Sequence, residues 1–173
     1  MRERIDALAA FIHRHPTLCC FQPPAAPSAI AEAEAAVGTP FPEPYRQFLS
    51  RFNGGFISLC GHTTAPDWAP ESAEWNSNAL FGTARLVREY TDQQQIWQLD
   101  RGWSGGWPYL PFCHTEGQEL LVFGPPSAGR SRAVLDAWHE VGPDEWGVLY
   151  PGFEDFLSAY VRGEGRVETI GTS

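Results

Sequence analysis

The chain of 173 residues contains no lysine, and all twelve of its basic residues are arginine. Positive charge is therefore scarce beside 21 acidic residues, and the formal net charge is −9. Nucleic acids and anionic membranes are recognised by basic surfaces, so this charge balance argues against both as partners. The same balance is compatible with a basic protein partner, and equally with an acidic surface that serves only solubility.

Long apolar runs are also missing. No stretch approaches the ~20 apolar residues of a membrane-spanning helix, so no membrane helix is expected. The apolar run 7–12 is too short for the core of a signal peptide, and we therefore expect a cytoplasmic protein. The length fits one domain over residues 1–173, with its core at 28–163 and a frayed tail at 164–173.

Patterns that hold metals or perform catalysis are absent as well. The four cysteines contain no Cys-x-x-Cys, and neither they nor the five histidines have the spacing of metal ligands, so we predict no metal and no cofactor. Neighbouring residues on a strand point to opposite faces, so Cys113 and His114 cannot form a nucleophile–base dyad together. The acid pairs Glu71/Glu74 and Glu116/Glu119 do not by their spacing set the carboxylate separation that a glycosidase needs. The sequence thus predicts no catalytic residues, and we expect the four thiols to be small buried groups.

What the chain does contain is an ordered series of amphipathic segments. Helical spacing or capping predicts helices at 4–14, 30–37, 42–52, 84–98 and 153–161, with Ser28 and Thr83 as N-caps. Short β-type runs predict strands at 56–60, 109–113, 119–123, 132–139 and 146–149, the second and third forming a hairpin. We read 20–27 as a connector, 61–78 as a long loop and 100–108 as a turn region. Helices, then hairpin-linked strands, then a helix predict an α+β fold with a largely antiparallel sheet flanked by N-terminal helices and a C-terminal helix.

The segment 30–55 carries the most specific pattern. Two short apolar helical faces are separated by Gly38, which can adopt the left-handed conformation that ends a helix. Pro42 is tolerated in the first turn of the second helix. Glu34 falls on the apolar face of the first helix, where a lone carboxylate is costly, so we predict that it is buried and bonded to backbone amides of 38–41 or to Arg46.

This segment resembles the hallmark of the SUKH superfamily, which includes yeast cell-wall regulators and consists mostly of bacterial immunity proteins. The matching positions are Glu34, Gly38, Phe41-Pro42, Tyr45, Phe48-Leu49 and Asn53-Gly54-Gly55. The resemblance implies an α+β fold closed by a Phe-rich helix, here 153–157. It also implies an immunity protein that neutralises a cognate toxin, often a nuclease, by stoichiometric binding. A regulatory adaptor of the same fold is the alternative, and an enzyme of unknown reaction is the third reading.

Several predicted loops contain both tryptophans and acidic residues. Interfaces with basic proteins combine the same two features, because aromatic side chains anchor the partner and carboxylates pair with its charges. Each tryptophan can belong either to the core or to such an interface. The family hairpin often carries Gly-Asp, whereas this chain has Gly117-Gln118. The residues predicted to contact the toxin are Glu71, Glu74, Trp75, Asp100, Trp103, Glu116 and Glu119.

Overall fold

A computed structural model describes residues 1–59, 77–102, 107–126 and 132–167, with the backbone alone for 100 and 101. Its helices are α1 (Arg2–Arg14), α2 (Pro27–Val37), α3 (Glu43–Leu49), α5 (Thr83–Arg101) and α6 (Phe153–Arg162). Its strands are β1 (Cys19–Phe21), β2 (Gly55–Ile57), β3 (Ala79–Leu80), β4 (Leu110–His114), β5 (Leu120–Phe123), β6 (Val134–Ala137) and β7 (Val148–Tyr150). The seven strands form one sheet in sequence order, and every neighbouring pair is antiparallel. The predicted α+β fold with an antiparallel sheet is therefore confirmed.

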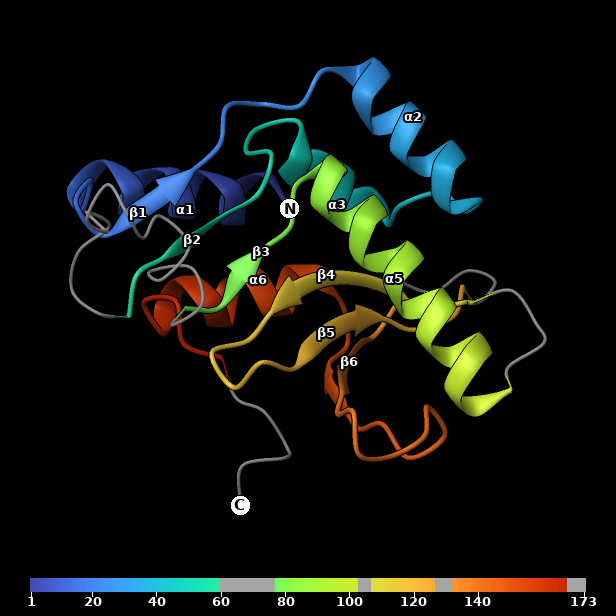
Figure 1. The fold of residues 1–173 in the computed structure, drawn as a ribbon. Coiled ribbons are helices and arrows are strands. Elements are labelled where there is room, and N and C mark those ends of the chain that lie inside the picture. Colours follow the sequence, from blue (N-terminus) through green and yellow to red (C-terminus); the bar gives the residue numbers. More distant parts are fainter. Residues whose placement is uncertain (60–76, 103–106, 127–131, 168–173) are drawn as a thin grey trace, which may run out of the picture.

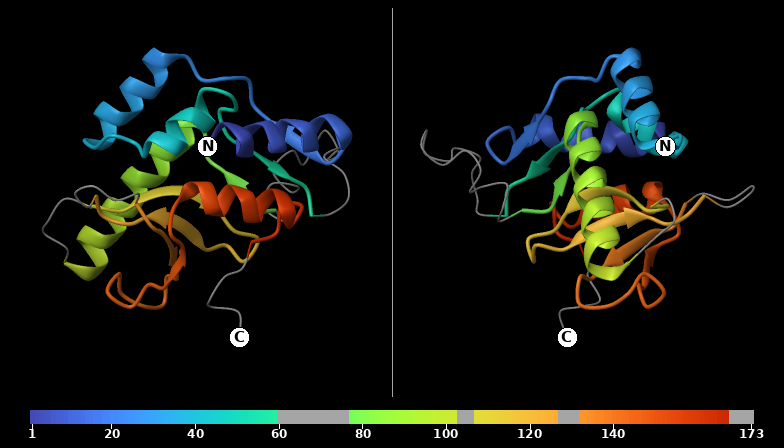
Figure 2. Two further views of the ribbon diagram at one scale, coloured as in Figure 1. Left: turned by 180° about the vertical axis from the view of Figure 1, so that it is seen from behind. Right: turned by 45° about the vertical axis from the view of Figure 1, so that its right-hand side comes forward.

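The helices lie on both sides of this sheet. Figure 1 shows α5 crossing in front of β4 and β5, with α2 above it and α6 behind the strands. Seen from behind, α6 covers the sheet and α1 continues the same layer (Figure 2). The strands are therefore enclosed by α6, α1 and α3 on one side, while α5 covers only part of the other.

The layer between the sheet and α6 is built from aromatic rings. Phe112 of β4 stacks on Phe123 of β5 with ring centroids 4.3 Å apart, and its edge meets Phe156 of α6 at 5.0 Å. Tyr45 of α3 is fully buried among these rings, and its hydroxyl donates a hydrogen bond of 2.7 Å to the carbonyl of Phe81. Period-two alternation on the strands and helical spacing on α6 bring the rings to one face.

Glu34 has both of the partners predicted for it. Its Oε1 accepts a hydrogen bond of 2.8 Å from the amide of Phe41 and lies 3.6 Å from Nε of Arg46. The Glu34 side chain is 16% exposed, so the carboxylate is largely removed from water, while the Arg46 side chain is 47% exposed. Glu34 thus ties the end of α2 to the start of α3.

We expect Glu34→Ala to lower the free energy of unfolding by about 1–2 kcal/mol, because the buried amide of Phe41 loses its acceptor. Arg46→Met is the matched control and should lower the free energy of unfolding by less than about 0.5 kcal/mol. The Arg46 side chain is exposed, and exposed ion pairs contribute little to stability. Urea denaturation of both variants measures the difference. Equal effects would mean that the ion pair, and not the amide, carries the contribution.

Several predicted boundaries were wrong. The connector 20–27 contains most of β1, and β3 lies in a stretch where no strand was expected. Ile5, Leu8 and Phe11 of α1 are buried in the main core, so the packed structure begins well before residue 28. The start of the predicted tail is also packed, because Nδ2 of Asn78 donates a hydrogen bond of 2.8 Å to the carbonyl of Gly165.

The two predicted N-caps were wrong for different reasons. Helix α2 begins at Pro27 with Ala26 at its N-cap, because proline is favoured in the first turn and places Ser28 inside the helix. Helix α5 begins at Thr83, whose amide donates a hydrogen bond of 2.9 Å to Oδ1 of Asn53. The cap of α5 therefore comes from the Asn-Gly-Gly turn rather than from Thr83 itself.

Candidate functional site on the open face of the sheet

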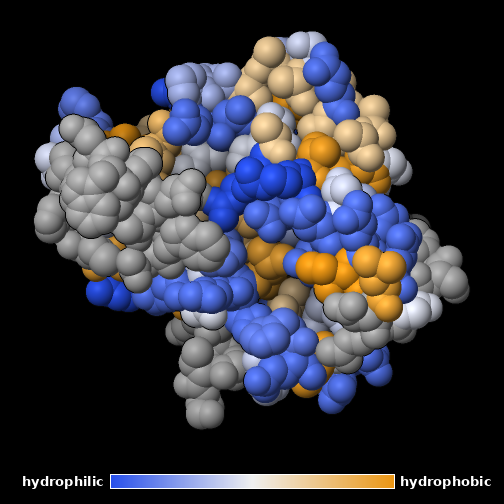
Figure 3. Space-filling model, viewed as in Figure 1, coloured by the Kyte–Doolittle hydropathy of each residue, from blue (hydrophilic) through white to orange (hydrophobic). Residues whose placement is uncertain are grey.

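The face of the sheet opposite α6 is apolar and only partly covered. Val122 of β5 and Leu135 and Ala137 of β6 form a separate buried cluster there. Val148 of β7 pairs with Leu135, so its side chain projects from the same face, and it is 62% exposed. Ile96 on α5 is 47% exposed beside this face. Hydrophobic and polar surfaces meet at a hollow next to α5 in Figure 3.

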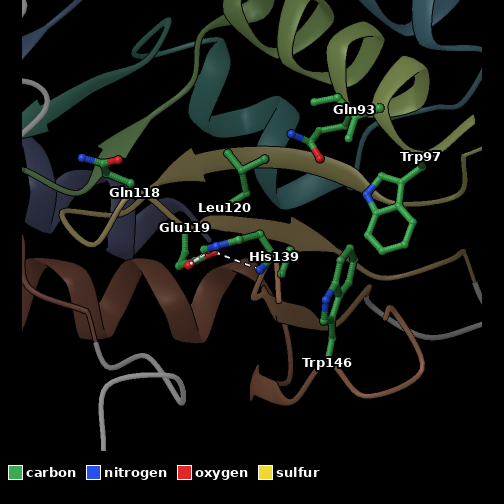
Figure 4. A pocket seen from close by; sticks show the side chains of 9 residues that line it. Gln93, Trp97, Gln118, Glu119, Leu120, His139 and Trp146 are labelled. Carbon is green, nitrogen blue, oxygen red and sulfur yellow. Dashed lines mark hydrogen bonds and ion pairs between the residues drawn. The ribbon is translucent and has the colours of Figure 1, made fainter. Parts of the chain in front are cut away.

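The hollow is a groove of about 310 Å³ between the second half of α5, the β4–β5 hairpin and the segment after β6. Figure 4 shows Trp97 and Trp146 at one end, Gln118 at the other, and Leu120, Glu119 and His139 between them. The lining residues are Gln93, Ile96, Trp97, Gln118, Glu119, Leu120, Ala137, His139 and Trp146. A second cavity of about 340 Å³ lies between α1 and α6 and is lined by Glu3, Arg4, Ala7, Leu157, Ser158, Val161 and Arg162.

The aromatic end of the groove is rigidly packed. The rings of Trp97 and Trp146 meet edge to face with centroids 6.0 Å apart, and Trp97 stacks on Trp107 at 5.2 Å. Trp146 also meets Tyr109 at 4.9 Å, and its Nε1 donates a hydrogen bond of 3.1 Å to the carbonyl of Trp138. A bound group would therefore meet preformed aromatic surfaces, which lowers the entropic cost of binding.

The polar side of the groove is built around Glu119. Its Oε1 lies 2.7 Å from Nδ1 of His139, and its Oε2 accepts a hydrogen bond of 3.2 Å from the His139 amide. The Glu119 side chain is 16% exposed, whereas that of His139 is 75% exposed. The amide of Glu119 donates a hydrogen bond of 3.1 Å to Oγ1 of Thr115, and Gln118 before it has a φ of 65°. The hairpin turn thus fixes a carboxylate at the margin of the groove.

Exposed acidic side chains lie on the two segments that form the polar side of the groove. Glu116 on the hairpin, and Glu140, Asp144 and Glu145 on the segment that carries His139 and Trp146, are all exposed. In the described parts of 107–161 the only arginine is Arg132, which is buried and donates to the carbonyls of Gly124 and Pro108 at 2.6 and 2.7 Å. Burial lowers the pKa of Arg132 to about 10, and the group stays charged at neutral pH.

The predicted contact residues are only partly brought together. Glu116 and Glu119 lie on the hairpin beside the groove. Glu71, Glu74, Trp75 and Trp103 lie outside the described residues. The backbone of Asp100 belongs to α5 rather than to a turn, because the helix continues to Arg101 before Gly102 ends it with a φ of 64°.

The sequence did not indicate Ile96, Trp97, His139 and Trp146 as site residues. Trp97 follows a run of glutamines on α5, and Trp146 lies on a segment between two strands. Their shared position depends on the pairing of β5 with β6, which places Leu120 opposite Ala137. The one available signal was the tryptophan content, which indicated either a core of large rings or a binding surface.

Burial disfavours the reactive thiolate form of two of the described cysteines. Burial raises the pKa of the Cys113 thiol far above its ordinary value, and raises that of Cys19 to about 11. Cys113 is buried as predicted, whereas Cys19 and Cys20 are only half-buried, and Cys60 lies outside the described residues. Residues 1–59, 77–102, 107–126 and 132–167 contain no group of three or more His, Cys, Asp or Glu side chains that could hold a metal ion.

None of the described helices has the length and apolar character needed to span a membrane.

Comparison with known proteins places the chain in a family. No curated protein matches the chain significantly. The family model described as "SMI1 / KNR4 family (SUKH-1)" matches residues 24–159, which include the Glu34-to-Gly55 motif, the hairpin and most of α6. The chain belongs to the SMI1/KNR4 family, SUKH-1.

Proposed function

We propose that this protein is an immunity protein, which neutralises a cognate bacterial toxin in the cytoplasm by binding it in a one-to-one complex. Membership of the SMI1/KNR4 family, SUKH-1, supports a role in protein binding. The observation that carries the proposal is a groove whose polar side is formed by acidic segments: the hairpin with Glu116 and Glu119, and the segment after β6 with the exposed acids of 140–145. A toxin that acts on an anionic substrate such as a nucleic acid has a basic surface, which these segments complement.

Electrostatic attraction should act mainly on the rate of association. We expect Glu116→Arg to slow association about 3–10-fold at low salt, with little change in dissociation, because Glu116 is exposed at the edge of the interface. Raising the salt concentration should slow the association of the wild-type protein with the toxin in the same way. Stopped-flow measurement with the purified toxin domain gives both rates.

Asp6→Arg is the control for that substitution. Asp6 is also exposed, but it lies on α1, which packs beside α6 on the other side of the sheet. The reversal changes the net charge by the same amount. If both variants slow association equally, the total charge and not the hairpin is responsible.

Growth of bacteria tests the proposed function itself. Candidate toxin domains from genes that neighbour this one are expressed in bacteria with or without the protein. We expect one of them to arrest growth without the protein and to allow normal growth with it. A regulatory adaptor of the same fold would leave growth arrested. Rescue by amounts far below those of the toxin would instead indicate an enzyme that modifies or degrades it.

A further inference from the structure

The groove offers two different binding surfaces next to each other, a carboxylate and an apolar floor. We infer that it receives a basic segment of the toxin, with an arginine or lysine paired to Glu119 and the neighbouring apolar side chain seated on Leu120 and Ala137. This inference rests on the proposed function and deepens it by naming the site and the class of segment bound.

The apolar half of the site follows from the open sheet face. Leu120 and Ala137 form the floor because they are opposite each other on β5 and β6 and point away from α6. Ile96 and the ring of Trp97 form the wall on α5, and Trp146 closes the end. Covering these surfaces removes apolar area from water, and the indole faces also attract a nearby cation.

The charged half depends on the unequal burial of Glu119 and His139. Glu119 is held in the groove, whereas the imidazole that pairs with it lies mostly in solvent. An incoming guanidinium can take the place of the imidazole, because it offers two parallel donors to the two oxygens of one carboxylate. His139 then turns toward water with little loss of packing. The pair Glu119–His139 thus keeps the carboxylate satisfied until the partner arrives.

Charge also favours a basic partner over a second copy of this chain as the occupant of the groove. A second copy would bring its own net charge of −9 against the exposed acids of the hairpin and of the segment after β6. Like charges across an interface disfavour association. A basic segment is instead attracted by acidic side chains on these segments, so we assign the groove to the toxin.

Binding of the purified toxin domain to variants of the lining tests the assignment by titration calorimetry. We expect Glu119→Gln to weaken binding about tenfold or more, because the partner's buried cation is left without its counter-charge. Ile96→Ser should weaken binding about 3–10-fold through loss of apolar contact. Both side chains are replaced without creating a cavity in the main core, and circular dichroism checks the fold.

Two matched variants keep the test specific. Leu99→Ser makes the same change on the same helix at a residue that is 82% exposed and does not line the groove. Asp6→Asn removes an exposed acid on α1. Both should bind within about twofold of the wild type, as energetically neutral surface positions do.

His139→Ala distinguishes exchange at Glu119 from a direct role of the histidine. We expect this variant to bind at least as tightly as the wild type, because the competitor of the toxin's cation is gone. A loss of affinity as large as that of Glu119→Gln would show that the toxin's cation does not replace His139 at Glu119.

The outcomes separate the two proposals. If the wild type binds the toxin and the groove variants bind equally well, the groove assignment is wrong and the proposed function stands. If the wild type does not bind the toxin, the proposed function fails and the assignment falls with it. If sedimentation shows a dimer of the free protein that Ile96→Ser dissociates, the groove is a self-interface and the assignment is overturned.

Discussion

Gly55→Ala is expected to prevent stable folding, with a loss of about 4 kcal/mol or more. Gly55 has a φ of 141°, and a Cβ there would meet the carbonyl oxygen of Cys20 and lie 2.5 Å from Cα of Phe21. Those atoms are backbone of β1, which pairs with β2 through Phe21 opposite Gly55. Relief would require β1 to separate from the sheet. Urea denaturation, or loss of soluble protein, measures the effect.

Gly38→Ala is the matched control within the same motif. Gly38 also has a positive φ, of 70°, but a Cβ there would have nothing within 4 Å. Only the left-handed backbone conformation is then penalised, at about 1 kcal/mol. If the two substitutions cost the same, backbone conformation rather than the approach of β1 explains why glycine occupies position 55.

Tyr160→Phe is expected to lower the free energy of unfolding by about 2–4 kcal/mol, because two buried backbone groups lose their partner. The Tyr160 hydroxyl accepts a hydrogen bond of 2.9 Å from the amide of Ile57 and donates one of 2.9 Å to the carbonyl of Asn78. Burial raises the pKa of Tyr160 well above its ordinary value, so the hydroxyl keeps its proton. One side chain of α6 thus joins β2 to the residue before β3.

Tyr45→Phe provides the comparison. Tyr45 is equally buried, but among the described residues its hydroxyl makes one hydrogen bond, which it donates to the carbonyl of Phe81. We expect a smaller loss of about 1–2 kcal/mol. Chemical denaturation of both variants under the same conditions tests the order, and a larger loss for Tyr45→Phe would contradict the role given to Tyr160.

The parts of the fold that the sequence predicted are those governed by local pattern. The hairpin of β4 and β5 follows from two β-type runs around Gly117-Gln118, and α6 follows from helical spacing of phenylalanines. β1 was missed because it runs into the proline-rich stretch before α2, which indicated a connector, and β3 was missed because its two residues carry no readable period. Their pairing depends instead on contacts with β2 and β4, which lie far away along the chain.

The candidate site was predictable to a smaller extent for the same reason. Glu119 belongs to a recognisable hairpin, so its location at this turn could be predicted from the sequence. The pairing of Glu119 with His139, and the meeting of Trp97 with Trp146, exist only once β5 and β6 are aligned and α5 crosses the sheet. Long-range register, which no local pattern encodes, creates the groove.

Titration of the toxin's activity with this protein tests the central claim most directly. The purified toxin domain is held at a concentration far above the expected dissociation constant, and its activity is measured as the protein is added. We predict a linear fall that reaches zero at a molar ratio of one, with the end point unchanged on longer incubation. Activity that persists beyond equimolar protein, or that disappears with time at a small fraction of it, would contradict neutralisation by stoichiometric binding.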